Sequence, residues 1–149
     1  ISSTSIRAAL SDGDVEKAHR LLGRPFEVRG VVTPGDRRGR TIGFPTANIP
    51  TTSDLQVPAD GVYAAWYIRE DGKEYPAAVN IGKRPTFYDD ADKSLIEAHL
   101  IGFRGDLYGE SAKVRFVRRL RGERKFEGIE PLKEQLAKDV ADASKCLSD

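Results

Sequence analysis

The chain has 149 residues and a formal net charge of +1, and 39% of its residues are hydrophobic. This length predicts one domain with one core, and the near-balanced charge gives no strong field that would draw the protein to nucleic acid or to a membrane. No apolar run is long enough to span a bilayer, and the start carries no signal-peptide pattern. The single cysteine, Cys146, cannot form an internal disulfide, so we expect a cytoplasmic protein. The two histidines, His19 and His99, lie far apart without cysteine partners, and zinc is not expected.

Two short helices are expected at the N-terminus. A Ser/Thr cluster can cap a first helix that runs through Leu10. Gly13 separates it from a second helix, which Asp14 can cap and Gly23 can end.

Six β-rich runs follow, with short turns and little helix between them. They span residues 26–32, 44–49, 61–69, 75–81, 95–103 and 112–120. Asp71-Gly72 is a strong hairpin signal between the third and the fourth run, and polar residues predict loops at 50–60 and 82–93. This pattern predicts a mainly β fold, a six-stranded antiparallel and Greek-key-like barrel, rather than a parallel sheet.

The C-terminal segment changes to a helical period. Its apolar residues follow three- and four-residue spacing, and they are Ile129, Leu132, Leu136, Val140, Ala143 and Leu147. Pro131 falls where a first helical turn tolerates it. We therefore expect an amphipathic C-terminal helix packed against the outside of the barrel.

The most unusual stretch covers residues 35–48, where three glycines recur at every fourth position. Such glycines allow a positive φ or a close approach of the backbone to a ligand. After them, Thr46 and Asn48 should project from one face of an extended segment and Ala47 from the other. Two neutral hard oxygens suit Mg²⁺, which takes its other ligands from water and phosphates. A glycine-rich hairpin loop with a polar strand face explains the same pattern equally well.

The segment from Gly39 to Asn48 resembles the signature of riboflavin kinases. Further ordered matches are Gly23–Phe26, Ile81–Thr86, Ile96–Leu100, Leu107–Glu110 and Arg119–Phe126. In bacteria this activity usually forms the C-terminal half of a bifunctional FAD synthetase. The resemblance implies an enzyme that transfers the γ-phosphate of ATP to the ribityl 5′-hydroxyl of riboflavin, with FMN and ADP as products and Mg²⁺ as the metal.

The first residues, from Ile1 to Arg7, resemble the motif that closes the nucleotidyltransferase module of those synthetases. The resemblance implies that residues 1–22 are a helical stub from the end of an upstream FMN adenylyltransferase module, and that residues 23–149 are the kinase barrel. The rest of that upstream module is absent, so we expect the chain to form FMN but not FAD.

The resemblance also implies roles for individual residues. In the family's Glu-x-His pattern Glu97 is the catalytic base, His99 is a wall of the site or a structural residue, and Arg121 lies near the transferred phosphate. The residues implied for ATP are Gly35, Gly39, Arg40, Thr41, Thr46, Asn48 and Tyr108, of which Thr46 and Asn48 hold the metal. Those implied for the flavin are Glu97, Arg121, Glu123, Arg124 and Phe126.

Each of these residues also has an ordinary structural explanation. A single strand glutamate such as Glu97 is usually solvated, and Phe126 could simply pack in a core. The basic run over residues 113–125 is typical of a solvated strand, although a basic barrel edge also resembles nucleic-acid-binding OB-folds. The competing hypothesis is therefore a non-catalytic barrel that binds flavin or nucleic acid. The balanced total charge and the lack of interleaved aromatics argue against nucleic acid.

Overall fold

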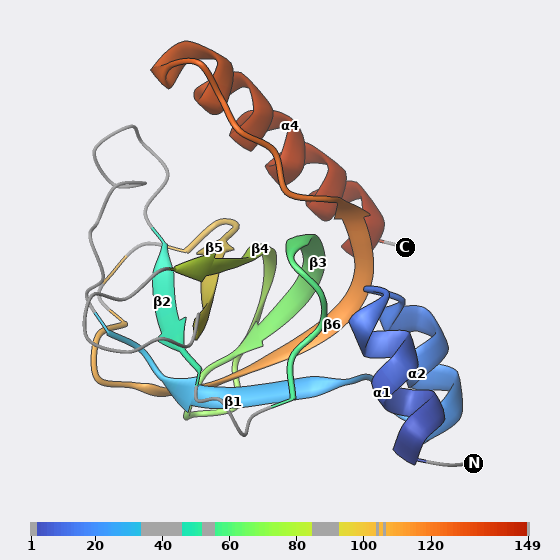
Figure 1. Ribbon diagram of the computed structural model, residues 1–149. Helices are drawn as coiled ribbons and strands as arrows, with labels where there is room; N and C mark the ends of the chain where they lie inside the picture. Colours follow the sequence, from blue (N-terminus) through green and yellow to red (C-terminus); the bar gives the residue numbers. More distant parts are fainter. Residues whose placement is uncertain are drawn as a thin grey trace.

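The computed structural model describes residues 3–33, 46–51, 56–84, 93–103, 105 and 107–148, and it is drawn in Figure 1. Three helices lie in this part of the chain, and they are α1 (Ser3–Ser11), α2 (Val15–Leu22) and α4 (Ile129–Leu147). The strands there are β1 (Glu27–Val31), β2 (Ala47–Pro50), β3 (Gly61–Ile68), β4 (Glu74–Arg84), β5 (Lys93–Leu100) and β6 (Ser111–Arg121).

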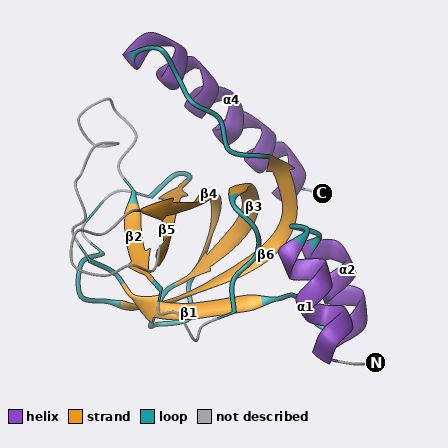
Figure 2. Ribbon diagram, in the orientation of Figure 1, coloured by secondary structure: helices purple, strands orange, loops and turns teal. Residues whose placement is uncertain are grey.

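The strands form one antiparallel sheet in the order β1-β6-β3-β4-β5-β2 (Figure 2). The sheet curves until its two edge strands meet, and a single bridge joins Thr33 to Asn48 there. The amide of Thr33 donates to the carbonyl of Asn48 over 2.8 Å. The predicted six-stranded antiparallel barrel is thus confirmed, and it is nearly closed.

The seam between β1 and β2 depends on a glycine. A Cβ built on Gly30 of β1 would lie only 2.4 Å from Cγ2 of Ile49 in β2. Real Cβ atoms essentially never come so close, so the absence of a side chain at Gly30 lets the two strands approach.

The barrel interior is filled by alternate side chains of the strands. In the register, Ile49 of β2 lies opposite Ile96 of β5, which lies opposite Ile81 of β4. All three are at most 1% exposed. Because side chains alternate along a strand, the residues between these point out of the barrel.

Helix α2 has the predicted ends, and α1 runs one residue beyond the expected Leu10. Asp14 caps α2, and its Oδ1 accepts a hydrogen bond from the amide of Lys17 over 3.0 Å. Gly23 ends the helix in the left-handed conformation, and Gly13 between the two helices has a φ of 76°.

Both N-terminal helices share the core of the barrel. Leu10, Val15 and Ala18 are at most 1% exposed and belong to the same apolar cluster as the barrel interior. The amide of Ala59, just before β3, also donates to the carbonyl of Leu10 over 2.8 Å. Residues 3–22 therefore pack against the barrel and share its core.

Helix α4 lies outside the barrel, as its apolar spacing predicts (Figure 1). Its Ala143 and Leu147 are buried in a second cluster with Ala64 of β3 and Ala78 of β4. None of the helices in the described residues is long and apolar enough to cross a membrane.

The strands around the fifth run differ from the prediction. Strand β4 continues to Arg84 and β5 begins at Lys93, so the expected loop over residues 82–93 is wrong at both ends. Backbone pairing extends the hairpin there without needing apolar side chains. Strand β5 then ends at Leu100, before the expected residue 103, because the chain turns at Gly102 with a φ of 78°.

Candidate functional site

Three polar residues form a row across the outer face of the barrel. Asn48 of β2 is the register partner of Glu97 of β5, and Glu97 is also the partner of Asn80 of β4. Directly opposite residues in an antiparallel pair share a face. Their strand neighbours point into the core, so the row of Asn48, Glu97 and Asn80 lies on the outside.

The row is sheltered although it lies outside the core. Asn48 is 1% exposed, while Glu97 and Asn80 are half-buried. Thr46, also half-buried, lies two residues before Asn48 at the entrance to β2. The Asn48 amide oxygen and the Thr46 hydroxyl are neutral hard oxygens of the kind that Mg²⁺ takes beside water and phosphate, so this pair fits that ion.

The barrel seam positions Asn48. Its backbone carbonyl accepts from the amide of Thr33 over 2.8 Å and lies 3.4 Å from the Thr33 hydroxyl. The position of the polar row is therefore coupled to closure of the barrel.

The segment after β6 reaches the other end of the row. A Cβ built on Gly82 would lie 3.2 Å from Oε1 of Glu123 and 3.9 Å from Nδ2 of Asn80. Partial burial raises the pKa of the Glu123 carboxyl, and nearby Asp60 raises it further, while Arg121 lowers it. Glu123 thus lies over β4 beside Asn80.

Arg121, the last residue of β6, and Arg124 of the segment after it bind helix α4. Arg121 donates from Nε and Nη2 to the two carboxylate oxygens of Asp139, over 2.9 and 2.7 Å. Arg124 donates to Oε1 of Gln135 over 2.8 Å. Both guanidinium groups lie over the ring of Phe126, at 6.0 and 5.3 Å from its centre.

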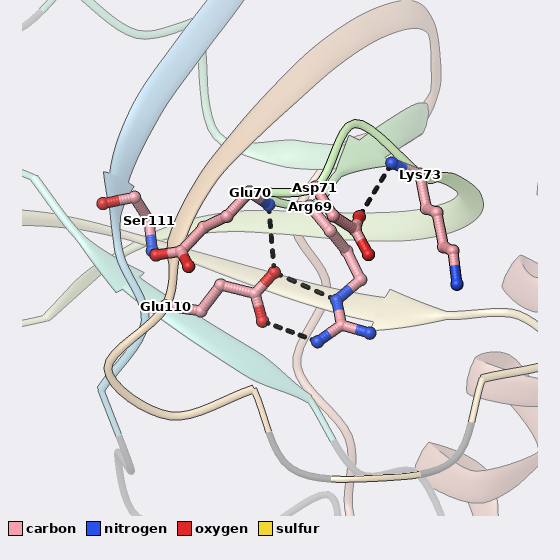
Figure 3. A network of polar contacts seen from close by, with 6 residues as sticks. All are labelled: Arg69, Glu70, Asp71, Lys73, Glu110 and Ser111. Atoms are coloured by element: carbon pink, nitrogen blue, oxygen red, sulfur yellow. Dashed lines mark hydrogen bonds and ion pairs between the residues drawn. The ribbon is translucent and has the colours of Figure 1, made fainter.

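A second polar network joins the β3–β4 hairpin to the turn before β6 (Figure 3). Arg69 donates to both carboxylate oxygens of Glu110, over 3.0 and 3.1 Å. The amide of Glu70 donates to Glu110, and the amide of Ser111 donates back to the Glu70 carboxylate. The β3–β4 hairpin therefore donates hydrogen bonds to Glu110, and Ser111 donates one back to the hairpin.

This second network fixes the turn that carries Tyr108. The amide of Gly109 donates to the carbonyl of Val32, and the amide of Val32 donates to the carbonyl of Glu110. Val32 immediately precedes Thr33, the bridge partner of Asn48. Tyr108 therefore lies on a turn that is anchored next to the seam.

The basic run on β6 is largely engaged by acceptors of the protein itself. Arg115 lies 3.8 Å from Glu27 and 3.6 Å from Glu74, and Arg118 lies 3.3 Å from Glu16. Carboxylates of the protein itself thus pair with Arg115 and Arg118, which argues against a nucleic-acid surface at these two residues.

The structure brings together most of the predicted site residues that it describes. Asn48 and Glu97 are neighbours, and Arg121, Arg124 and Phe126 form a cluster between β6 and α4, while Glu123 joins the row at Asn80. Four predicted ATP residues lie outside the described residues, and they are Gly35, Gly39, Arg40 and Thr41.

Two residues near the candidate site were not identified from the sequence, although each interrupts an apolar pattern. Asn80 interrupts an otherwise apolar stretch of β4. Asp139 stands on the apolar stripe of α4, seven residues after Leu132 and four before Ala143, and is only 2% exposed. A polar residue at a position that the period assigns to the core predicts a buried polar contact.

A family model described as "Flavokinase: Riboflavin kinase" matches residues 22–147. The bifunctional riboflavin kinase/FMN adenylyltransferase of Bacillus subtilis is 46% identical over 149 residues, which is 99% of this chain and 47% of that protein. The chain thus spans about half the length of the curated relatives it matches.

Two solved structures are also similar. A crystal structure titled macrolide-efflux protein, from Streptococcus pneumoniae, matches 97% of this chain and 46% of its own with a TM-score of 0.89 and 40% identity. The riboflavin kinase of Trypanosoma brucei matches 84% of this chain and 81% of its own with a TM-score of 0.64 and 26% identity.

Proposed function

We propose that this chain, which belongs to the riboflavin kinase family, transfers the γ-phosphate of ATP to the ribityl 5′-hydroxyl of riboflavin and so forms FMN and ADP. The observation that carries the proposal is the row on the outer face of the barrel, in which Asn48 lies directly opposite Glu97. A barrel that only binds a ligand has no need of a metal-binding oxygen beside a carboxylate base.

In this proposal Thr46 and Asn48 are the residues that would hold Mg²⁺ beside the phosphates of ATP. The bound metal would neutralise phosphate charge as the phosphoryl group is transferred. Both residues supply neutral oxygens, so they leave the charge of the ion available to the polyphosphate. Tyr108 supports the nucleotide from its turn beside the seam.

Glu97 is the proposed catalytic base. It accepts the proton of the attacking 5′-hydroxyl, a step that phosphoryl transfer needs in addition to positioning. Its place in the register keeps the carboxylate next to Asn48. Because Glu97 is half-buried, its carboxylate is partly shielded from water but still accessible to a substrate.

The segment after β6 is the proposed flavin contact. Phe126 supplies an aromatic ring next to Arg121 and Arg124, and Glu123 lies over β4 next to the polar row. In the complete protein an upstream FMN adenylyltransferase module is the proposed covalent partner, with residues 1–22 as its closing segment, and the location is cytoplasmic.

The test is a direct assay. The purified chain is incubated with riboflavin, ATP and Mg²⁺, and flavins are separated by chromatography. FMN should form with the metal and not in its absence, and no FAD should appear. Riboflavin binding without any FMN would favour the competing hypothesis of a non-catalytic binding barrel.

A further inference from the structure

We infer that Asp139 of helix α4 is a positioning residue that anchors the segment of residues 122–127 through Arg121, and that Arg121 acts as this anchor rather than as a ligand of the transferred phosphate. The inference rests on the proposed function only for its kinetic consequence. The anchor itself is independent of any substrate.

The first support is the number of hydrogen bonds that Arg121 already makes. Its Nε and Nη2 donate to Asp139, and its Nη1 donates to the carbonyl of Gly122 over 3.0 Å. Three of its five N–H groups thus have a protein acceptor. Binding a phosphate through the fork of Nε and Nη2 would require Arg121 to leave Asp139.

The second support is the burial of Asp139. Its side chain is 3% exposed, against 22% for Arg121. A buried carboxylate that loses its cation is left without compensation, which opposes release of Arg121. The pair is also bidentate, the geometry in which an arginine is held most firmly.

The third support is that the contact extends along the segment. Gln135 lies one turn before Asp139 on α4, donates to Oδ1 of Asp139 over 2.9 Å, and accepts from Arg124 over 2.8 Å. One face of α4 therefore holds the segment at Arg121 and again at Arg124. Phe126 lies against both guanidinium groups, so the same contacts set the position of its ring.

Loss of the anchor should weaken flavin binding more than it slows phosphoryl transfer. If only a fraction of molecules hold the segment in place, the apparent affinity for the flavin falls by that fraction. A change that reduces the anchored fraction to about one-tenth would raise the KM for riboflavin about tenfold. The KM for ATP and kcat should change much less.

The experiment compares Asp139→Asn with Asp142→Asn, which removes the same charge from an exposed position of the same helix. Limited proteolysis with chymotrypsin reports cleavage after Phe126 in the folded chain, without any need for activity. We expect D139N to be cleaved severalfold faster than wild type and to show the raised riboflavin KM, with D142N like wild type in both. Equal cleavage of D139N and D142N would overturn the inference.

A double-variant comparison separates anchoring from phosphate contact. Arg121→Met, D139N and the double variant should share the raised riboflavin KM, because each breaks the same pair. A further loss of kcat when R121M is added to D139N would overturn the anchor role, since Arg121 would then act on the substrate by itself.

Two outcomes need a separate measurement: a D139N protein that does not fold, and a wild type that forms no FMN. If D139N fails to fold, Gln135→Leu removes only the link between Asp139 and Arg124 and should still accelerate cleavage after Phe126, whereas unchanged cleavage would refute the inference. If wild type forms no FMN, the proposed function fails, but proteolysis still decides whether Asp139 anchors the segment.

Discussion

Asn48 and Glu97 face each other across the pairing of β2 with β5. One carries a buried amide oxygen and the other a half-buried carboxylate, and the backbone register fixes their separation. The strands therefore place the proposed metal ligand and the proposed base next to each other without any help from a loop.

Glu97→Gln should lower turnover by about 10²–10⁴-fold, because the amide keeps the size of the side chain but cannot accept the proton. Steady-state FMN formation gives the rate, and a thermal melt on the same preparation reports folding. Glu74→Gln is the matched control, since it makes the same change on the exposed side of β4. Unchanged turnover in a folded E97Q protein would contradict the proposed base.

Thr46→Ala and Asn48→Ala should each weaken binding of the magnesium nucleotide. Even outer partners of a metal site typically cost 10–100-fold when lost, so removal of a direct ligand should cost at least about tenfold. Calorimetric titration with ATP, with and without Mg²⁺, separates the metal from the nucleotide. An equal loss in both titrations would assign these residues to the nucleotide instead of the metal.

Glu110→Gln should destabilise the fold by about 1–3 kcal/mol, because Glu110 accepts two hydrogen bonds from Arg69 and one from the amide of Glu70. The side chain is only 10% exposed, so water cannot replace these contacts fully. Denaturant unfolding measures the change. Glu74→Gln again serves as the control, because its pair with Arg115 is exposed and should be worth about 1 kcal/mol or less.

Tyr63→Phe should reduce the sensitivity of the protein to alkali. Burial raises the pKa of Tyr63 to about 12 from its ordinary value of 10.0. Between those two values the unfolded chain loses the phenol proton and the folded chain keeps it, so stability falls as pH rises, by about 1–3 kcal/mol for this group. Removal of the hydroxyl removes that part of the decline.

Denaturant unfolding at pH 9 and pH 11.5 tests the Tyr63 prediction. The phenylalanine variant should be less stable than wild type at pH 9, because the bond from the Tyr63 hydroxyl to the carbonyl of Ala59 is lost. It should then lose less stability than wild type up to pH 11.5. Parallel declines in the two proteins would mean that Tyr63 does not retain its proton.

Much of the fold could be predicted from the sequence because its signals are local. Asp14 and Gly23 mark the two ends of α2, and Asp71-Gly72 marks the β3–β4 hairpin, each within a few residues of the structure it determines. The alternation along β5 likewise put Glu97 on one face with its neighbours buried.

The contacts that join distant parts of the chain could not be predicted in this way. Arg121 and Asp139 are 18 residues apart, and Arg69 and Glu110 are 41 apart, on elements whose packing fixes the partner. The sequence reveals that β6 carries several arginines. Only the fold determines which carboxylate each arginine pairs with. The resemblance to a family supplied the site roles that spacing alone left open.

The close approach at Gly30 has a consequence for solubility. The two edges of a sheet carry unpaired backbone groups that can recruit strands from other molecules. In this barrel the two edges meet at the bridge between Thr33 and Asn48, and a side chain at position 30 would collide with Ile49 and hold them apart. The glycine thus lets the edges approach each other and leaves less of either edge open to a neighbouring molecule.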